Sequence, residues 1–182
     1  MFYKSLIAIC VSFLMVTPIN DEVISWRDTI KLSWSQFKGT PRTDLSAVAV
    51  TASGITFEFS VKETDTHVVG FDTKVFAHFY PNKSWYIKEE GDDHILAHEQ
   101  LHFDITELYA RKFRKQISYL KVNDNIKFQL RNLHEKINKE LAATQNRYDK
   151  ESDNSVNREF QVKWNIYVKQ ELAKLEAYKS KD

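Results

Sequence analysis

The sequence has few of the residues that break or cross-link a chain. Its 182 residues include one cysteine, three prolines and four glycines. Low glycine and proline content favours long helices and strands over a loop-rich sandwich, and a single cysteine excludes a disulfide framework within the chain. Hydrophobic residues make up 42% and aromatic residues 13%. This composition and length predict a globular protein with one domain and a substantial core.

A basic cluster is also missing. The 26 lysines and arginines and the 25 aspartates and glutamates give a formal charge of +1, and the two signs are mixed along the chain. Domains that bind nucleic acid usually gather basic residues on one face or in one segment. We therefore expect no nucleic-acid partner.

The first twenty residues differ from the rest. The segment MFYKSLIAICVSFLMVTPIN has one charge, Lys4, followed by an apolar run from Leu6 to Val16. The run is too short to span a bilayer comfortably and has the length of a signal-peptide core. We predict a signal peptide at residues 1 to about 20 and a single domain at 21–182. The mature protein is then secreted or periplasmic, with no membrane attachment. A buried N-terminal strand or an uncleaved anchor is the alternative.

Hydrophobic periodicity divides the remaining chain into two parts. Up to about residue 86, apolar and polar residues alternate as in half-buried strands, at residues 30–34, 47–51, 55–61 and 75–80. From about residue 92 the period is helical, and it predicts helices at about 92–120, 126–148 and 160–175. A sheet followed by helices predicts one α+β domain, mostly antiparallel in its sheet.

The first predicted helix contains the segment ILAHEQLHFDITE at residues 95–107. Residues four apart on a helix share a face, so His98 and His102 can aim their imidazoles at one ion. Zn²⁺ accepts such ligands, and catalytic zinc sites keep one position open for water. Glu99 is rotated by one residue from His98 and is placed to act as a general base on that water. The H-E-x-x-H spacing therefore predicts a zinc site with a catalytic Glu99. A histidine pair without metal, packed in the core or exposed, is the alternative.

A third ligand is not expected from the same helix. Asp104 and Glu107 are turned well away from the histidine face, and we expect them to be solvated or helix-stabilising charges. The ligand should come from a segment that folds back over the site. The candidates are His134 on the second predicted helix and three acidic residues near its end, Asp149, Glu151 and Asp153.

Several motifs resemble a family of bacterial proteins described as predicted secreted zinc-dependent proteases, a domain of otherwise unknown function. The resemblance covers most of the chain after residue 21 and is strongest in LAHEQLHFDI at 96–105, which YAR follows at 109–111. Further matching segments are LSWSQFKG at 32–39, FYPNKSW at 79–85, YD at 148–149 and QVKW at 161–164. The resemblance implies a zincin-like fold, a zinc cofactor, and cleavage of a peptide or protein substrate.

One segment departs from that family. There, Y-D is followed by a threonine and then a histidine, whereas this chain has Ser152 and Asn154 at those positions. If that histidine is the family's third ligand, this chain lacks it, because an amide oxygen is a poor zinc ligand beside an imidazole. Glu151 or Asp153 would then replace it, or the metal would bind weakly or not at all.

Two hypotheses about function follow. In the first, the protein is a secreted zinc metallopeptidase whose extended substrate pairs with a sheet edge, such as Val75–Tyr80. In the second, it is a non-catalytic exported binding module that retains the fold with a degenerate metal site. Asn154 is the residue that favours the second hypothesis.

Overall fold

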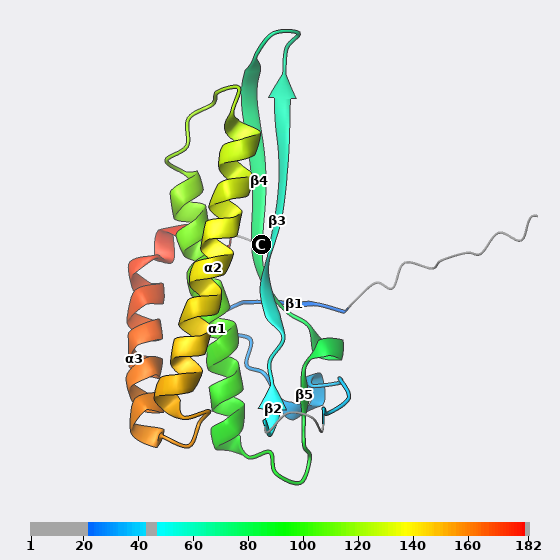
Figure 1. The fold of residues 1–182 in the computed structure, drawn as a ribbon, viewed down its shortest axis with the longest axis vertical. Coiled ribbons are helices and arrows are strands. Elements are labelled where there is room, and N and C mark those ends of the chain that lie inside the picture. The colour runs from blue at the N-terminus through cyan, green and yellow to red at the C-terminus, as the bar shows by residue number, and fades with distance from the viewer. Residues whose placement is uncertain (1–21, 43–46, 181–182) are drawn as a thin grey trace, which may run out of the picture.

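The computed structural model describes residues 22–42 and 47–180, so the predicted signal peptide lies outside the described residues. The protein is an α+β structure in which an antiparallel sheet is followed by three helices (Figure 1). The predicted α+β class, with an antiparallel sheet before the helices, is thus confirmed. The strands are β1 (Ile24–Ser25), β2 (Ala49–Val50), β3 (Ser53–Glu63), β4 (Val68–Phe79) and β5 (Trp85–Tyr86). The helices are α1 (Asp93–Ile117), α2 (Ile126–Ser152) and α3 (Arg158–Lys174).

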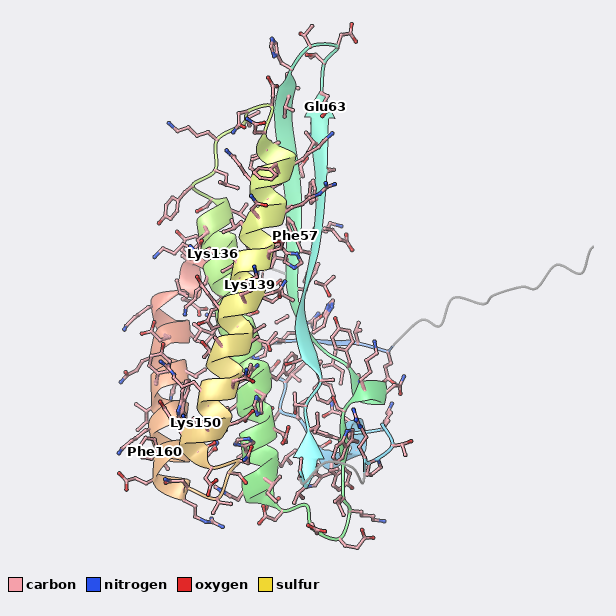
Figure 2. All side chains as sticks on the ribbon, viewed as in Figure 1. Phe57, Glu63, Lys136, Lys139, Lys150 and Phe160 are labelled. Carbon is pink, nitrogen blue, oxygen red and sulfur yellow. The ribbon has the colours of Figure 1, made fainter. Side chains whose placement is uncertain are left out.

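The long β3–β4 hairpin forms most of the sheet. Its register pairs Ser53 with Phe79 and Phe59 with Thr73, and β1 joins the far edge of β4. The short strands β2 and β5 form a separate antiparallel pair, which Figure 1 places beside the first turns of α1. Figure 2 shows Phe57 of β3 on the side of the hairpin that faces the helices. Its ring packs edge-on against Phe113 of α1, with centroids 4.8 Å apart.

The strand predictions are confirmed where long-range pairing is extensive and wrong where it is not. Residues 55–61 lie in β3 and residues 75–79 in β4, but residues 30–34 form no strand. Instead, Trp34 begins a short 3₁₀ helix that is preceded by a side-chain cap: the Ser33 backbone N–H donates to Oε1 of Gln36 at 2.7 Å. Such local bonds compete with strand pairing, and an alternating sequence does not reveal them.

The helix predictions are close to the observed bounds because the boundaries carry chemical signals. The Asp92 carboxylate accepts a hydrogen bond from the Ile95 N–H at 2.7 Å, which caps α1. At the C-terminal end of α2, Asp153 adopts a left-handed conformation with φ of 49°, which stops the helix. Asn157 caps α3 by accepting from the Phe160 N–H at 3.2 Å.

Helix α1 is the centre of the fold. It contacts α2, α3, β3 and β4, so its buried side chains point in several directions. They include Leu101, Phe103, Ile105, Leu108 and Phe113. Full burial of each such side chain contributes about 1.5–3 kcal/mol, and close packing restricts the movement of everything else on the helix. Within the described residues, no helix is both long and apolar enough to cross a bilayer.

Of the two roles predicted for Asp104 and Glu107, solvation is wrong, whereas the i,i+4 pair of Glu107 with Arg111 is a contact within the helix. Glu107 is 1% exposed and accepts from Nε of Arg111 at 2.9 Å and from Nη1 of Arg114 at 3.1 Å. Asp104 accepts from the Trp26 indole at 2.7 Å, and burial raises its pKa although this hydrogen bond partly opposes the rise. Both carboxylates turn away from the histidines, as predicted, but they face other packed elements rather than solvent.

Candidate metal centre

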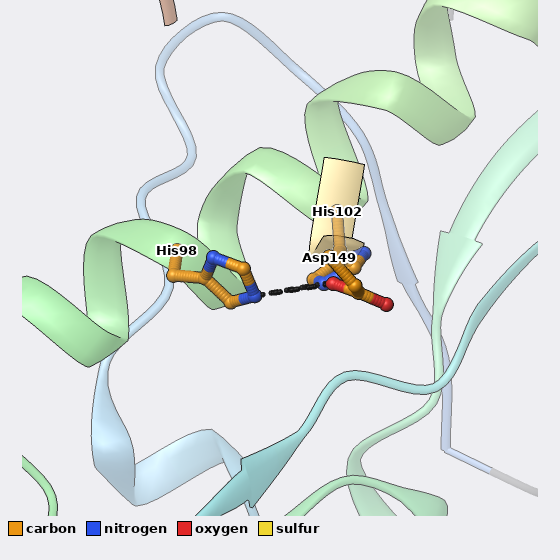
Figure 3. A group of neighbouring side chains, drawn as sticks. All are labelled: His98, His102 and Asp149. Carbon is orange, nitrogen blue, oxygen red and sulfur yellow. Dashed lines mark hydrogen bonds and ion pairs between the residues drawn. The ribbon is translucent and has the colours of Figure 1, made fainter. Parts of the chain in front are cut away.

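Three potential ligand atoms from two helices meet at one point (Figure 3). His98 and His102 lie one turn apart on α1, and their Nε2 atoms are 3.2 Å apart. Asp149 comes from the last turns of α2, and its Oδ1 lies 2.8 Å from Nε2 of His102 and 3.3 Å from Nε2 of His98. Both predicted histidines therefore meet one of the four residues proposed to supply a third ligand.

The spacing of these atoms suits a zinc ion. Ligand atoms at about 2.0–2.1 Å from a tetrahedral zinc lie about 3.4 Å from one another, close to the three separations of 2.8–3.3 Å here. Two imidazoles with one carboxylate form a known catalytic ligand set, which leaves the fourth position open. In the described part of the chain, no other group of three His, Cys, Asp or Glu side chains is placed to hold a metal.

Two glutamine side chains determine which nitrogen of each histidine faces this point. Nδ1 of His102 lies 2.5 Å from Oε1 of Gln145 on α2, and Nδ1 of His98 lies 3.1 Å from Oε1 of Gln161 on α3. A carboxamide oxygen only accepts, so each Nδ1 carries a proton. In a neutral ring, Nε2 then presents a lone pair. Two lone pairs and a carboxylate oxygen facing one another are stable only with a proton or a cation between them, and the residues present therefore fit a metal ion.

A proton can occupy the same position as a metal. Burial lowers the pKa of His102, but the hydrogen bond to Asp149 and the nearby charges outweigh it, so that the pKa lies above its usual value. Burial acts to raise the pKa of Asp149, but hydrogen bonds from His102 and His98 hold it well below its usual range. These opposite shifts favour a proton between His102 and Asp149 in the metal-free site, and a divalent cation would have to displace it.

Glu99 lies in the wall of the same cavity, which has a volume of about 660 Å³. Its side chain is 4% exposed, and its Oε2 has no hydrogen-bond partner among the described residues. A buried carboxylate oxygen without a donor is costly, so this atom is poised to receive a proton or a donor from a molecule in the cavity. The Thr51 hydroxyl donates to the Glu99 backbone carbonyl at 3.2 Å, which ties the segment after β2 to the helix.

Two of the other third-ligand candidates lie elsewhere. His134 is half-buried and packs against the rings of Phe57 and Phe113, with centroids 5.2 Å and 5.6 Å apart, so it lies away from the ligand group. Glu151 accepts a hydrogen bond from the Trp164 indole at 2.8 Å, so its carboxylate serves to hold α3 against α2.

The last candidate, Asp153, borders the cavity together with Asn154, but neither residue joins the ligand group. Asp153 and Asn154 line the cavity and have φ of 49° and 47°. The Asn154 N–H donates to the Asp149 carbonyl at 2.8 Å. The turn that contains them thus closes one side of the cavity, while the ligand atom comes from Asp149.

Sequence reasoning missed the residues that support the histidines. Tyr148 stacks on His98 with ring centroids 4.5 Å apart, and its hydroxyl donates to Oε1 of Gln161 at 2.7 Å. Gln145 could have been found from the sequence, because it lies four residues before Asp149 and so shares its face of α2. Gln161 had none, since only the packing of α3 brings it to His98.

The proposed substrate edge at Val75–Tyr80 is also wrong. This stretch pairs with β3 on one side. On its other side, the Trp26 N–H donates to the Ala77 carbonyl at 3.0 Å and the Arg114 guanidinium donates to the Val75 carbonyl at 2.8 Å. The extended segment that borders the cavity is instead residues 47–51, which include β2.

Comparison with known proteins identifies one family. A family model described as bacterial protein of unknown function, DUF922, matches residues 29–155. No curated protein and no solved structure matches the chain. The matched residues include the whole candidate metal centre and Glu99, whereas Gln161 and the rest of α3 lie beyond them.

Proposed function

The chain belongs to the bacterial DUF922 family of unknown function, and we propose that it is a secreted zinc-dependent metallopeptidase with a zincin-like fold. One observation carries the proposal. The Nε2 atoms of His98 and His102 and the Oδ1 of Asp149 converge within 3.3 Å of one another, in the cavity that also holds the buried Glu99.

His98, His102 and Asp149 would hold the ion in this proposal. When bound, Zn²⁺ supplies a Lewis acid that polarises a carbonyl group and lowers the pKa of water toward neutrality. Asp149 brings one negative charge to the ligand set. The amide oxygens of Gln145 and Gln161 keep the two imidazoles turned toward the ion.

Glu99 performs the proton transfers. Its unpartnered Oε2 accepts a proton from the water that attacks the peptide carbonyl carbon, and the same carboxyl group then protonates the leaving nitrogen as the C–N bond breaks. Burial keeps bulk water from competing for this carboxylate. Each proton that Glu99 takes from water is thus returned to the amine product.

An extended peptide fits along β2. In the β2–β5 pair, Ala49 faces Tyr86, and the Ile87 N–H donates to the Val48 carbonyl at 2.8 Å. The alternation of an antiparallel ladder directs the backbone groups of Ala49 away from β5. Among the described residues no strand pairs with that edge, so a substrate strand would pair there, and the segment already lines the cavity.

Replacing Glu99 by glutamine tests the proposed role directly. Glutamine keeps the shape but accepts no proton, so Glu99→Gln should retain zinc and lose about 10²–10⁴-fold in peptide hydrolysis. Zinc content by elemental analysis and hydrolysis of a peptide library are measured side by side, with the exposed Glu90→Gln as control. Full activity in Glu99→Gln would refute the proposal, whereas loss of zinc would make Glu99 a ligand or a structural residue.

The alternative, a binding module with a degenerate metal site, depended on Asn154 replacing a ligand. Asp149 supplies a third donor without position 154, so Asn154 no longer favours that alternative. A purified protein that takes up no zinc, with its fold intact, would favour it again.

A further inference from the structure

A helix outside the family match contributes to the metal centre. Gln161 of α3 is 3% exposed, and its Oε1 accepts from the His98 Nδ1–H at 3.1 Å and from the Tyr148 hydroxyl at 2.7 Å. With the carboxamide oxygen at this position, both the imidazole and the hydroxyl donate to the same acceptor. Gln161 Nε2 is buried and has no hydrogen-bond partner among the described residues.

Gln145 plays the equivalent part for the second histidine. Its Oε1 lies 2.5 Å from Nδ1 of His102, and its Nε2 donates to the His102 backbone carbonyl at 2.9 Å. A backbone carbonyl only accepts, so it fixes the orientation of the carboxamide. One glutamine from each of the two C-terminal helices thus serves one histidine of α1.

We propose that Gln145 and Gln161 are positioning residues of the zinc centre, and that α3 is therefore a required part of it. This rests on the metal centre of the proposed function but not on its peptidase activity. Histidine ligands of zinc commonly donate to a carboxylate, which increases the electron donation of the ring. Here both acceptors are neutral amides. Compared with carboxylates, they would leave more positive charge on the ion, although Asp149 adds one negative charge to the ligand set.

The placement of α3 rests on contacts close to the site. The Trp164 indole donates to Glu151 at 2.8 Å, and its ring lies 5.4 Å from that of Tyr148. Trp164 is one turn along α3 from Gln161, so the same contact that docks the helix sets the position of the carboxamide. A shift of α3 would release His98 Nδ1 from its acceptor.

Zinc affinity of two substitutions at position 161 tests the proposal. Gln161→Met removes the acceptor and keeps the length, and it should weaken zinc binding at least tenfold, as expected when a supporting partner of a ligand is lost. Gln161→Glu loses no hydrogen bond, because the replaced Nε2 has no partner. It supplies a carboxylate to His98 and should tighten binding at least tenfold.

The measurement is a competition titration of Zn²⁺ against a chelating dye at fixed pH, with Gln170→Met and Gln170→Glu on the exposed face of α3 as controls. Affinities of both position-161 variants within threefold of their controls would overturn the proposal. Should Gln161→Met fail to fold, Gln161→Glu decides alone. If the two substitutions change zinc affinity as predicted but the protein hydrolyses no peptide, the peptidase function is refuted and this inference stands.

A second readout separates positioning from folding. In ¹⁵N-histidine-labelled, metal-free protein, His98 should carry its proton on Nδ1, and in Gln161→Met it should distribute between both nitrogens while the melting temperature stays near that of the control. A His98 that keeps the Nδ1–H tautomer in Gln161→Met would show that Gln161 does not position it.

Discussion

At the scale of single residues, Asp149 decides whether the histidine pair is a metal site. Two imidazoles alone bind zinc weakly, whereas a third donor completes the usual catalytic set. The Asp149 side chain is 35% exposed, and its Oδ1 lies 2.8 Å from Nε2 of His102. Its carboxylate is held near both histidines by the last turns of α2, and the left-handed turn that follows closes one side of the cavity.

We predict that Asp149→Ala weakens zinc binding by at least tenfold, or about 1.4 kcal/mol. The matched control is Asp153→Ala, four residues later in the cavity wall but outside the ligand group. A dye-competition titration on both variants measures the difference. Equal affinities for the two variants would exclude Asp149 as the third ligand.

The proton shared by His102 and Asp149 predicts an unusual pH dependence of stability. The folded-state pKa of His102 is raised, so its contribution is complete below about 6.5, the unfolded value, and is lost as pH rises through the folded value. The pKa of Asp149 is lowered, so its contribution is present above about 3.9 and is lost as pH falls through the folded value.

The metal-free protein should therefore lose melting temperature as pH rises above about 6.5. The zinc-bound protein should gain stability over the same range, because its ligands must be deprotonated. Thermal melts from pH 5 to 9, with and without zinc, measure this, and Asp149→Asn should flatten the metal-free curve. If melting temperature depends on pH in the same way with and without zinc, the proton and the metal do not compete for one position.

At the scale of elements, the helices and the hairpin strands could be predicted from the sequence, whereas of the short strands only β2 falls within a predicted strand, at residues 47–51. Apolar residues at helical spacing locate α1 and α2 because each helix satisfies its own backbone hydrogen bonds. By contrast, β2 and β5 are two residues long and exist only because each meets the other. The same limit applies to the site: His98 and His102 could be paired from their spacing, while choosing Asp149 over Glu151 needs the register of α2 on α1.

The free edge of β2 predicts how a substrate is recognised. If a peptide pairs with Ala49, every second backbone N–H of the substrate makes a hydrogen bond to the strand. N-methylation of those alternate amides should raise KM roughly 2- to 10-fold, since each bond contributes about 0.5–1.5 kcal/mol. Methylation of the intervening amides should have little effect. A methylation scan of one cleaved peptide provides the measurement, and effects without a two-residue period would exclude strand pairing.

At the scale of the whole molecule, a buried ion-pair cluster joins the C-terminal segment that includes Leu172 and Tyr178 to α1. Arg111 donates to Glu107 and to the Leu172 carbonyl at 2.8 Å, and Arg114 donates to Glu107 and to the Tyr178 carbonyl at 2.9 Å. Glu107 is therefore the one carboxylate to which both arginines donate, and the arginines hold the C-terminal segment against α1. Helix spacing placed Glu107 away from the histidines and one turn from Arg111, but it gave no sign of the Leu172 and Tyr178 carbonyls, which lie more than sixty residues from the arginines.

Removing Glu107 should destabilise the whole fold rather than the site alone. Glu107→Ala leaves the 1%-exposed Arg111 without its buried carboxylate, and loss of one partner of a buried pair typically costs about 3–5 kcal/mol. Exposed pairs contribute about 0–1 kcal/mol, so Glu159→Ala, which removes the partner of Lys163 on the surface of α3, is the control. Urea unfolding in the presence of a chelator compares the two without the contribution of bound metal. A Glu107→Ala protein as stable as the control would contradict this role of the cluster. The guanidinium groups would then rely on other acceptors, among them Glu176 and the carbonyls of the C-terminal segment, and Glu107 would not hold that segment in place.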